Sequence, residues 1–123
     1  MKNPKQKLSE YDEQCLIFEW ARANEGAHPE LWLLNASMNG IRTSIGLATK
    51  MKRQGLKRGY PDIFLPVPKK YFHGLFIELK IKGNKTSEYQ EEWLKRLTDN
   101  CYDCRVCYGH QEAIKVIKEY LGI

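Results

Sequence analysis

Hydrophobic and polar positions along this chain predict helices and short strands in turn. A helical spacing of apolar residues runs from about Ser9 to Asn24, and Ser9 with Asp12 forms the N-terminal capping signal. Further helices are predicted over 45–54, 87–100 and 111–121, and short strands over 31–34, 62–67, 75–80 and 103–108. The order α-β-α-β-β-α-β-α predicts an α/β fold in which helices flank a mixed central sheet.

The two strands at 62–67 and 75–80 are predicted to pair as an antiparallel hairpin, because proline and glycine residues break the chain between them. Folding one strand on the other places Asp62 opposite Glu78 or Lys80. Strand alternation puts Glu78 and Lys80 on one face of the sheet and most aliphatic residues of both strands on the other. Two carboxylates and one ammonium group are therefore expected at one end of the hairpin.

These three side chains suit metal-assisted hydrolysis of a phosphodiester. Mg²⁺ prefers oxygen ligands and keeps several waters, so Asp62 and Glu78 could hold it and leave positions open for a phosphate and a water. Lys80 would orient the nucleophile or neutralise charge in the transition state. The alternative is a surface ion pair at the end of a hairpin, which is worth at most about 1 kcal/mol.

Two of the predicted helices carry a polar residue inside an apolar face. Glu13 lies within the apolar arc of the first helix, and Gln90 lies within that of the helix at 87–100. A polar group that faces the core needs a binding partner. Glu13 is either held by an arginine or by backbone amides, or it faces the same acidic cluster as Asp62 and Glu78. Gln90 is either a hydrogen-bonded core amide or part of that shared site.

The composition suits a polyanionic partner. The chain has 20 Lys and Arg against 15 Asp and Glu, a net charge of +5 and a pI near 9.0. Residues 8–123 are predicted to form one domain after a flexible N-terminus at 1–7. Basic residues on both sides of the acidic centre would contact phosphates, although those at 50–53 could also form a solvated helical face. The expected DNA-contacting residues are Lys50, Lys52, Arg53, Lys57, Arg58, Lys82, Lys85 and Thr86.

Several motifs occur together over about residues 8–108, in the order Glu13, Gly59-Tyr60-Pro61-Asp62, Glu78-Leu79-Lys80, Lys85-Thr86 and Gln90. This set resembles the PD-(D/E)XK nuclease superfamily and, more narrowly, the small stand-alone VRR-NUC domains of phages and bacteria. The resemblance implies a restriction-endonuclease-like fold and an endonuclease that depends on Mg²⁺ or Mn²⁺. It implies that Asp62, Glu78 and the Leu79 carbonyl bind the metal and that Lys80 is the catalytic lysine. Glu13, through a metal-bound water, and Gln90 would be supporting site residues.

The resemblance also bears on the DNA substrate and the assembly. Stand-alone members of this family resemble Holliday-junction resolvases, which implies a homodimer that acts on branched DNA. Tyr11, Cys15 and Phe18 form an apolar patch on the first helix that could serve as a dimer contact. The other readings are a flap-cleaving or restriction-like nuclease, a module that binds nucleic acid without cutting it, and a module for a different partner.

The four cysteines are interpreted as reduced core thiols. Some nucleases of the superfamily carry an iron–sulfur cluster, but Cys104 and Cys107 fall three apart in a strand and so face opposite sides, while Cys15 and Cys101 lie elsewhere. The chain has no apolar stretch long enough for a membrane span and no signal peptide. We therefore expect a cytoplasmic protein, or one in the host cytoplasm if it is viral.

Overall fold

A four-stranded mixed sheet forms the centre of the protein in the computed structural model, which describes residues 7–37 and 44–123. The strands lie in the order β1-β2-β3-β4, and the first three pair antiparallel. The last pair, β3 and β4, is parallel, and the chain crosses between them through a helix. The strands are β1 (Asn35–Ala36), β2 (Ile63–Leu65), β3 (Leu75–Lys80) and β4 (Asp103–Tyr108).

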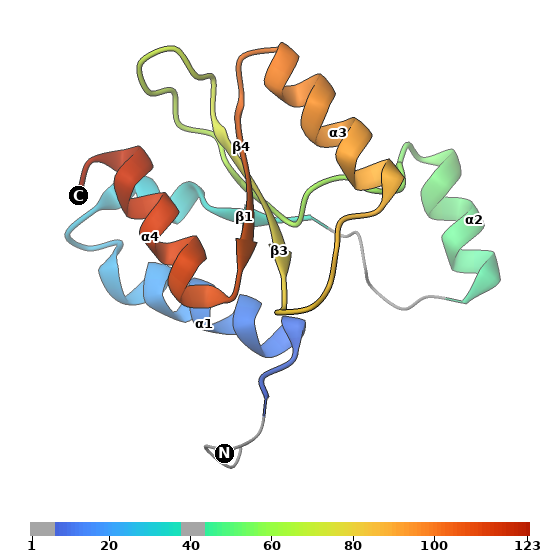
Figure 1. Ribbon diagram of the computed structural model, residues 1–123, viewed down its shortest axis with the longest axis horizontal. Helices are drawn as coiled ribbons and strands as arrows, with labels where there is room; N and C mark the ends of the chain where they lie inside the picture. The colour runs from blue at the N-terminus through green and yellow to red at the C-terminus, as the bar shows by residue number, and fades with distance from the viewer. Residues whose placement is uncertain (1–6, 38–43) are drawn as a thin grey trace.

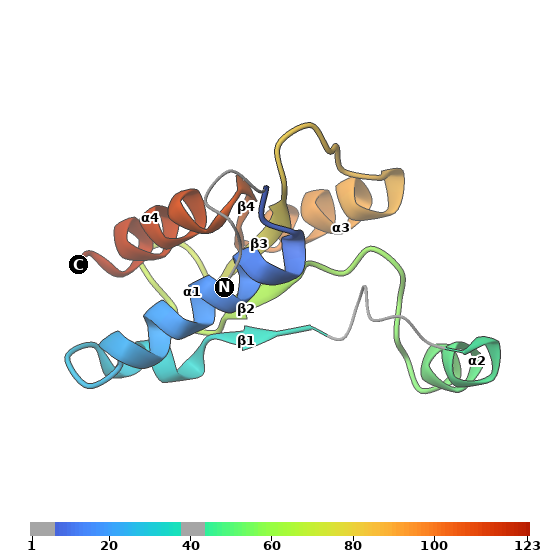
Figure 2. The same ribbon diagram turned by 90° about the horizontal axis from the view of Figure 1, so that it is seen from below.

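Three of the four α-helices pack against this sheet (Figure 1). Helices α1 (Glu10–Asn24) and α4 (His110–Leu121) lie side by side and pack on β3, whereas α3 (Glu88–Asp99) packs on β4 from the other side. Helix α2 (Ile45–Arg53) stands apart from these layers, at the far right of Figures 1 and 2. The sheet with α1, α3 and α4 therefore forms the body of the domain.

Alternation along β2 and β3 separates the two sides of the sheet. Ile63 and Ile77 are almost fully buried and join the core beneath α1 and α4. Phe64 and Phe76 point to the opposite side, where their rings stack with centroids 4.1 Å apart. The antiparallel register pairs Ile63 with Ile77, which confirms the predicted hairpin. Each buried aliphatic side chain contributes about 1.5–3 kcal/mol, so this alternation fixes the register.

The prediction of a strand at residues 31–34 is wrong. Residues Pro29–Leu33 form a 3₁₀ helix, η1, and the first strand follows at Asn35–Ala36. Leu31 and Leu34 are buried while Trp32 is 74% exposed, so the apolar residues face the core at a spacing of three. A short continuous apolar run fits a helical turn or a strand equally well, and the preceding proline favours the turn.

The other helices begin and end within one residue of their predicted positions. Ser9 caps α1 in a reciprocal box with Asp12, and Ser87 caps α3 in the same way with Gln90. The element order α-β-α-β-β-α-β-α is confirmed, and within residues 7–37 and 44–123 η1 is the one addition. The predicted flexible N-terminus falls almost wholly outside the described residues, which begin at Lys7.

Candidate active site

Asp62 and Glu78 come together where β2 begins and β3 approaches its end. The register that pairs Ile63 with Ile77 places Asp62 opposite Glu78 when it is continued by one residue. The backbone N–H of Leu79 donates a hydrogen bond of 2.7 Å to Oδ2 of Asp62. The backbone carbonyl of Asp62 accepts a 2.8 Å bond from the N–H of Ser37. The Asp62 side chain is thus fixed against the strand that carries Glu78.

Glu78 is a buried carboxylate without a hydrogen-bond partner. It is 1% exposed, and neither of its oxygens receives a hydrogen bond from the described residues. Burial raises the pKa of Glu78 from its ordinary value of 4.5 to about 9. The adjacent Asp62 carboxyl raises this pKa further, because the two groups share a proton when Glu78 is neutral and repel when both are charged, and Lys80 lowers it. The charged form of such a group has lost its hydration, so the carboxyl keeps its proton unless something positive binds it.

The donor set at this point fits a hard divalent cation. Mg²⁺ binds carboxylate oxygens. The two oxygens of Glu78 have no hydrogen-bond donor among the described residues and could bind such a cation. No group of three or more His, Cys, Asp and Glu side chains in residues 7–37 and 44–123 is already arranged as a metal site. Asp62, Glu78, a backbone carbonyl and waters can together bind Mg²⁺ without a third His, Cys, Asp or Glu side chain.

The segment before Asp62 is clamped onto α3. Gly59 has φ +89°, and a side chain there would bring its Cβ within 2.6 Å of the Tyr89 backbone. The guanidinium of Arg58 lies 4.7 Å from the centre of the Tyr89 ring, and the Trp93 indole donates 3.0 Å to the Arg58 carbonyl. These contacts hold the chain at the point where it enters the site.

Gln90 lies in the first turn of α3 and is half-buried. Its Oε1 accepts a 2.8 Å bond from the N–H of Ser87, and its own N–H donates to the Ser87 hydroxyl at 3.2 Å. The side chain is thus engaged in the capping box of α3, which leaves its amide N–H₂ to donate elsewhere. Its role as a supporting site residue stays a prediction.

Glu13 binds the start of α4 rather than a side chain of the acidic pair. Its Oε2 accepts a 2.6 Å bond from the backbone N–H of His110, and the His110 Nδ1 lies 2.5 Å from the same oxygen. This matches the expectation in which backbone amides hold Glu13. The adjacent Gly109 donates its N–H to the Lys80 carbonyl at 3.0 Å. Glu13 therefore fixes the helix that is tied to the end of β3.

Removing this contact should cost stability. In Glu13→Ala the first turn of α4 loses a charged cap, for which we expect a loss of about 1–2 kcal/mol in the free energy of unfolding. Urea unfolding followed by circular dichroism measures it. Glu13→Gln should retain most of the stability, because the amide oxygen can still accept from His110. Equal losses in the two variants would contradict the capping role.

Glu10, one turn before Glu13, is a half-buried carboxyl that influences the site electrostatically. Burial raises the pKa of Glu10, the carboxylate of Asp62 raises it further and the ammonium of Lys80 lowers it. Glu10 in turn raises the pKa of Glu78. Sequence reasoning did not single out this residue. Its three-residue spacing from Glu13, which puts both on one side of the helix, is the signal that could have found it.

The sequence model of the VRR-NUC domain matches residues 6–111 of this chain. The chain belongs to the VRR-NUC family. A solved structure described as a VRR_NUC domain protein is 28% identical to this VRR-NUC domain and superposes with a TM-score of 0.81. That similarity covers 95% of this chain and 91% of the other. No curated protein matches the chain.

Membership in the VRR-NUC family implies a nuclease-type function and a DNA partner. It also confirms the predicted fold class, since the matching structure shares the arrangement of sheet and helices. None of the described helices is long and apolar enough to cross a membrane.

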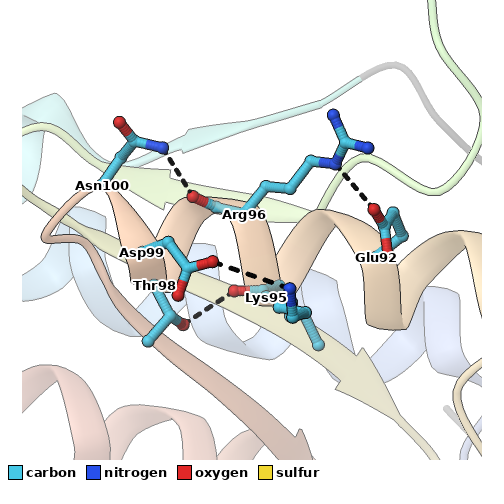
Figure 3. A network of polar contacts seen from close by, with 7 residues as sticks. Glu92, Lys95, Arg96, Thr98, Asp99 and Asn100 are labelled. Atoms are coloured by element: carbon cyan, nitrogen blue, oxygen red, sulfur yellow. Dashed lines mark hydrogen bonds and ion pairs between the residues drawn. The ribbon is translucent and has the colours of Figure 1, made fainter.

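Basic residues on α3 differ in their surroundings from those predicted to contact DNA. On α3, Arg96 contacts Glu92 at 2.7 Å and Lys95 contacts Asp99 at 3.8 Å, so these cations are matched by carboxylates of the same helix (Figure 3). The residues predicted to contact DNA lie elsewhere, and most of them are exposed. Lys50, Lys52, Arg53, Lys57 and Arg58 lie on or just after α2, and Lys82 and Lys85 lie in the loop after β3. The Thr86 hydroxyl donates to Glu91.

The patch proposed for a dimer contact is only partly exposed. Tyr11 is 77% exposed, whereas Cys15 is half-buried and Phe18 packs against the core. Among the other thiols Cys107 is buried, and burial raises its pKa to about 12, which keeps it protonated and unreactive. Cys101 is exposed, so its interpretation as a core thiol is wrong.

Proposed function

We propose that this VRR-NUC domain is a metal-dependent, structure-specific DNA endonuclease that acts as a homodimer on four-way junctions. The observation that carries the proposal is Glu78, a buried carboxylate whose oxygens have no partner and which lies beside Asp62 and near Lys80. A buried carboxylate of this kind is typical of a functional site, where a bound cation stabilises its charged form. The preference for branched DNA and the homodimer rest on the resemblance to stand-alone family members.

The residues that would hold Mg²⁺ or Mn²⁺ are Asp62, Glu78 and the backbone carbonyl of Leu79. When bound, the ion would polarise the phosphate and lower the pKa of a coordinated water. Asp62 is oriented by the Leu79 N–H, so its carboxylate is held in place before any ion arrives. Lys80 would orient the nucleophile or neutralise charge that grows on the phosphate oxygens.

Glu10 is proposed as the third carboxylate of this site, in place of Glu13. Its electrostatic interaction with Asp62, Glu78 and Lys80 supports the assignment, whereas Glu13 is engaged with His110. Gln90 would support the site from α3 through its amide N–H₂. The exposed basic residues on both sides of the site would hold phosphates that flank the scissile bond.

A contrast between the two glutamates of α1 tests this assignment. We expect Glu10→Gln to weaken Mn²⁺ binding and cleavage at least about tenfold, the scale of losing one ligand or its support. We expect Glu13→Gln to leave both nearly unchanged. Isothermal titration with Mn²⁺ and single-turnover cleavage measure the two effects. A greater loss in Glu13→Gln would restore Glu13 as the supporting residue.

The proposed function is tested by cleavage of labelled four-way junction, flap, duplex and single-stranded DNA with Mg²⁺, Mn²⁺ or EDTA. Symmetric, metal-dependent nicking of the junction, absent in Asp62→Ala and Glu78→Ala, is the expected result. Cutting of flaps or plain duplex instead would keep the active site and reject the junction preference. Binding without any cutting would favour a non-catalytic nucleic-acid module. Light scattering tests the homodimer, and a monomer at tens of micromolar would reject it.

A further inference from the structure

Helix α2 is built unlike the other helices of the domain. It has no buried residue and packs extensively on no other described element. Both views show it beside the layered body rather than within it (Figures 1 and 2). A helix of nine residues is marginal on its own in water, and most helices in proteins are stabilised by an apolar face that packs on something. Helix α2 is thus suited to be covered by a partner.

The charge of the chain identifies the kind of partner. Residues 31–61 contain six Lys or Arg and no Asp or Glu. The rest of the chain contains 14 Lys or Arg and 15 Asp or Glu, so the positive net charge comes from this one segment. No carboxylate of the described residues pairs with Lys50, Lys52 or Arg53, in contrast to the matched charges on α3. Such a surface is complementary to a polyanion.

One face of α2 combines cations with an exposed aliphatic side chain. Ile45, Thr49, Lys52 and Arg53 follow at helical spacing and share this face. Ile45 is 89% exposed, and Lys52 and Arg53 are also exposed. Leu47 is 49% exposed and lies on the opposite side of the helix. We call the set Ile45, Thr49, Lys52 and Arg53 the α2 face.

We propose that the α2 face binds branched DNA, with Lys52 and Arg53 on phosphates and Ile45 against unstacked bases at the branch. This inference rests on the proposed nuclease function and adds the source of its preference for DNA structure. Bases within a duplex are stacked, whereas those at a branch expose apolar faces, which aliphatic side chains of DNA-binding proteins contact as wedges. A second copy of the chain fits this face less well, because a twofold contact would bring the same cations together.

The placement of α2 relative to the site supports the same reading. The chain leaves α2 and reaches Asp62 within nine residues of Arg53. Between them, Arg58 and Gly59 are clamped onto α3. Because Arg58 and Gly59 are fixed on α3, the segment that joins α2 to Asp62 is anchored at one point. DNA bound to the α2 face would therefore lie within a short length of chain from the carboxylates.

The test is DNA binding in EDTA, where no cleavage occurs, measured by fluorescence anisotropy with a four-way junction and a duplex of equal length. Ile45→Ser should lower the ratio of junction to duplex affinity about fivefold, the scale of one partly buried aliphatic side chain. Leu47→Ser, on the opposite side, is the matched control and should leave the ratio unchanged. Ile and Ser have similar helix propensities, so Ile45→Ser leaves the helix intact, and Leu47→Ser, which lowers helix propensity slightly, tests whether helix stability alone changes the ratio.

Two further readings complete the test. Lys52→Ala with Arg53→Ala should weaken binding to both DNAs and reduce the slope of log affinity against log salt by about 1–2. 2-Aminopurine beside the branch should change its fluorescence on binding of the unchanged protein and not of Ile45→Ser.

An unchanged affinity ratio in Ile45→Ser would overturn the proposal. So would a dimer that this substitution dissociates, since the face would then contact a second copy. If Ile45→Ser lowers the ratio of junction to duplex affinity but the unchanged protein cuts no DNA, the role of the α2 face is supported and the nuclease function is rejected. If the unchanged protein cuts DNA but Ile45→Ser leaves the affinity ratio unchanged, the nuclease function is supported and the role of the α2 face is rejected.

Discussion

Replacing Glu78 with Gln is expected to abolish metal-dependent cleavage and, at the same time, to stabilise the metal-free protein at neutral and alkaline pH. Glu78 is buried, and neither of its oxygens has a hydrogen-bond donor among the described residues. The amide of Gln is nearly isosteric but carries no charge, so it removes both the proposed metal ligand and the cost of burying a carboxylate. Loss of function and gain of stability in one variant is a combination that ordinary core substitutions do not give.

The pH dependence of stability follows from the raised pKa of Glu78. The folded protein keeps this proton up to about pH 9, whereas the unfolded chain releases it near pH 4.5. The folded state therefore binds more protons between these values, and its stability falls as the pH rises through them. The slope for one proton approaches about 1.4 kcal/mol per pH unit. Mg²⁺ or Mn²⁺ should reduce this fall, because binding of the ion favours the charged carboxylate.

Urea unfolding from pH 5 to pH 9, with and without Mn²⁺, measures these effects in the unchanged protein and in Glu78→Gln. The variant should lose most of the pH slope and all of the stabilisation by Mn²⁺. Glu92→Gln is the matched control, because Glu92 is exposed on α3 and pairs with Arg96. If the variant kept both the slope and the response to Mn²⁺, Glu78 would be neither the titrating group nor a ligand.

Replacing Lys80 with Ala should slow cleavage at least about 100-fold, the scale of losing one electrostatic stabiliser of the transition state. Binding of DNA and of metal should persist, since Asp62 and Glu78 remain. The backbone of Lys80 stays in place because it is held by β4 and by the N–H of Gly109. The effect should therefore appear in the single-turnover rate and leave the dissociation constants nearly unchanged.

Single-turnover cleavage at saturating enzyme, together with binding in Ca²⁺, separates the two quantities. Lys95→Ala serves as control because it removes the same charge from α3, where Lys95 pairs with Asp99. Full turnover in Lys80→Ala would remove Lys80 from the mechanism. A proportional loss of DNA affinity would instead assign it to substrate binding.

The hairpin was predictable because its determinants are local. Strand alternation and the breakers between 62–67 and 75–80 place Asp62 opposite Glu78, and the register of β2 and β3 confirms this pairing. The capped helices were predictable for the same reason, since Ser9 and Ser87 mark their starts. Local spacing could not distinguish a strand from a 3₁₀ turn at 31–34, where tertiary burial decides.

The surroundings of Glu10 and Glu13 depend on long-range geometry. Both residues lie on one side of α1, one turn apart. Glu13 contacts His110 next to the residue that binds the Lys80 carbonyl, and Glu10 interacts electrostatically with Asp62 and Lys80. These surroundings depend on where α1 crosses the sheet, and the sequence carries no direct sign of that crossing point. The partner of Glu13 is His110, 97 residues away along the chain. Likewise, α2 is exposed because it packs extensively on no other described element, which no pattern within α2 itself reveals.

The hydrogen bond from Gly109 to the Lys80 carbonyl means that the site is completed by a segment that is synthesised after all of its proposed catalytic residues. All of the proposed catalytic residues lie before residue 91, yet β3, which carries two of them, is a central strand whose second neighbour is β4. A ribosome that has released the chain only as far as Gln90 has exposed the carboxylates and the lysine without the strand and helix that fix them. The proposed cutting activity should therefore arise only after β4 and α4 have emerged and docked.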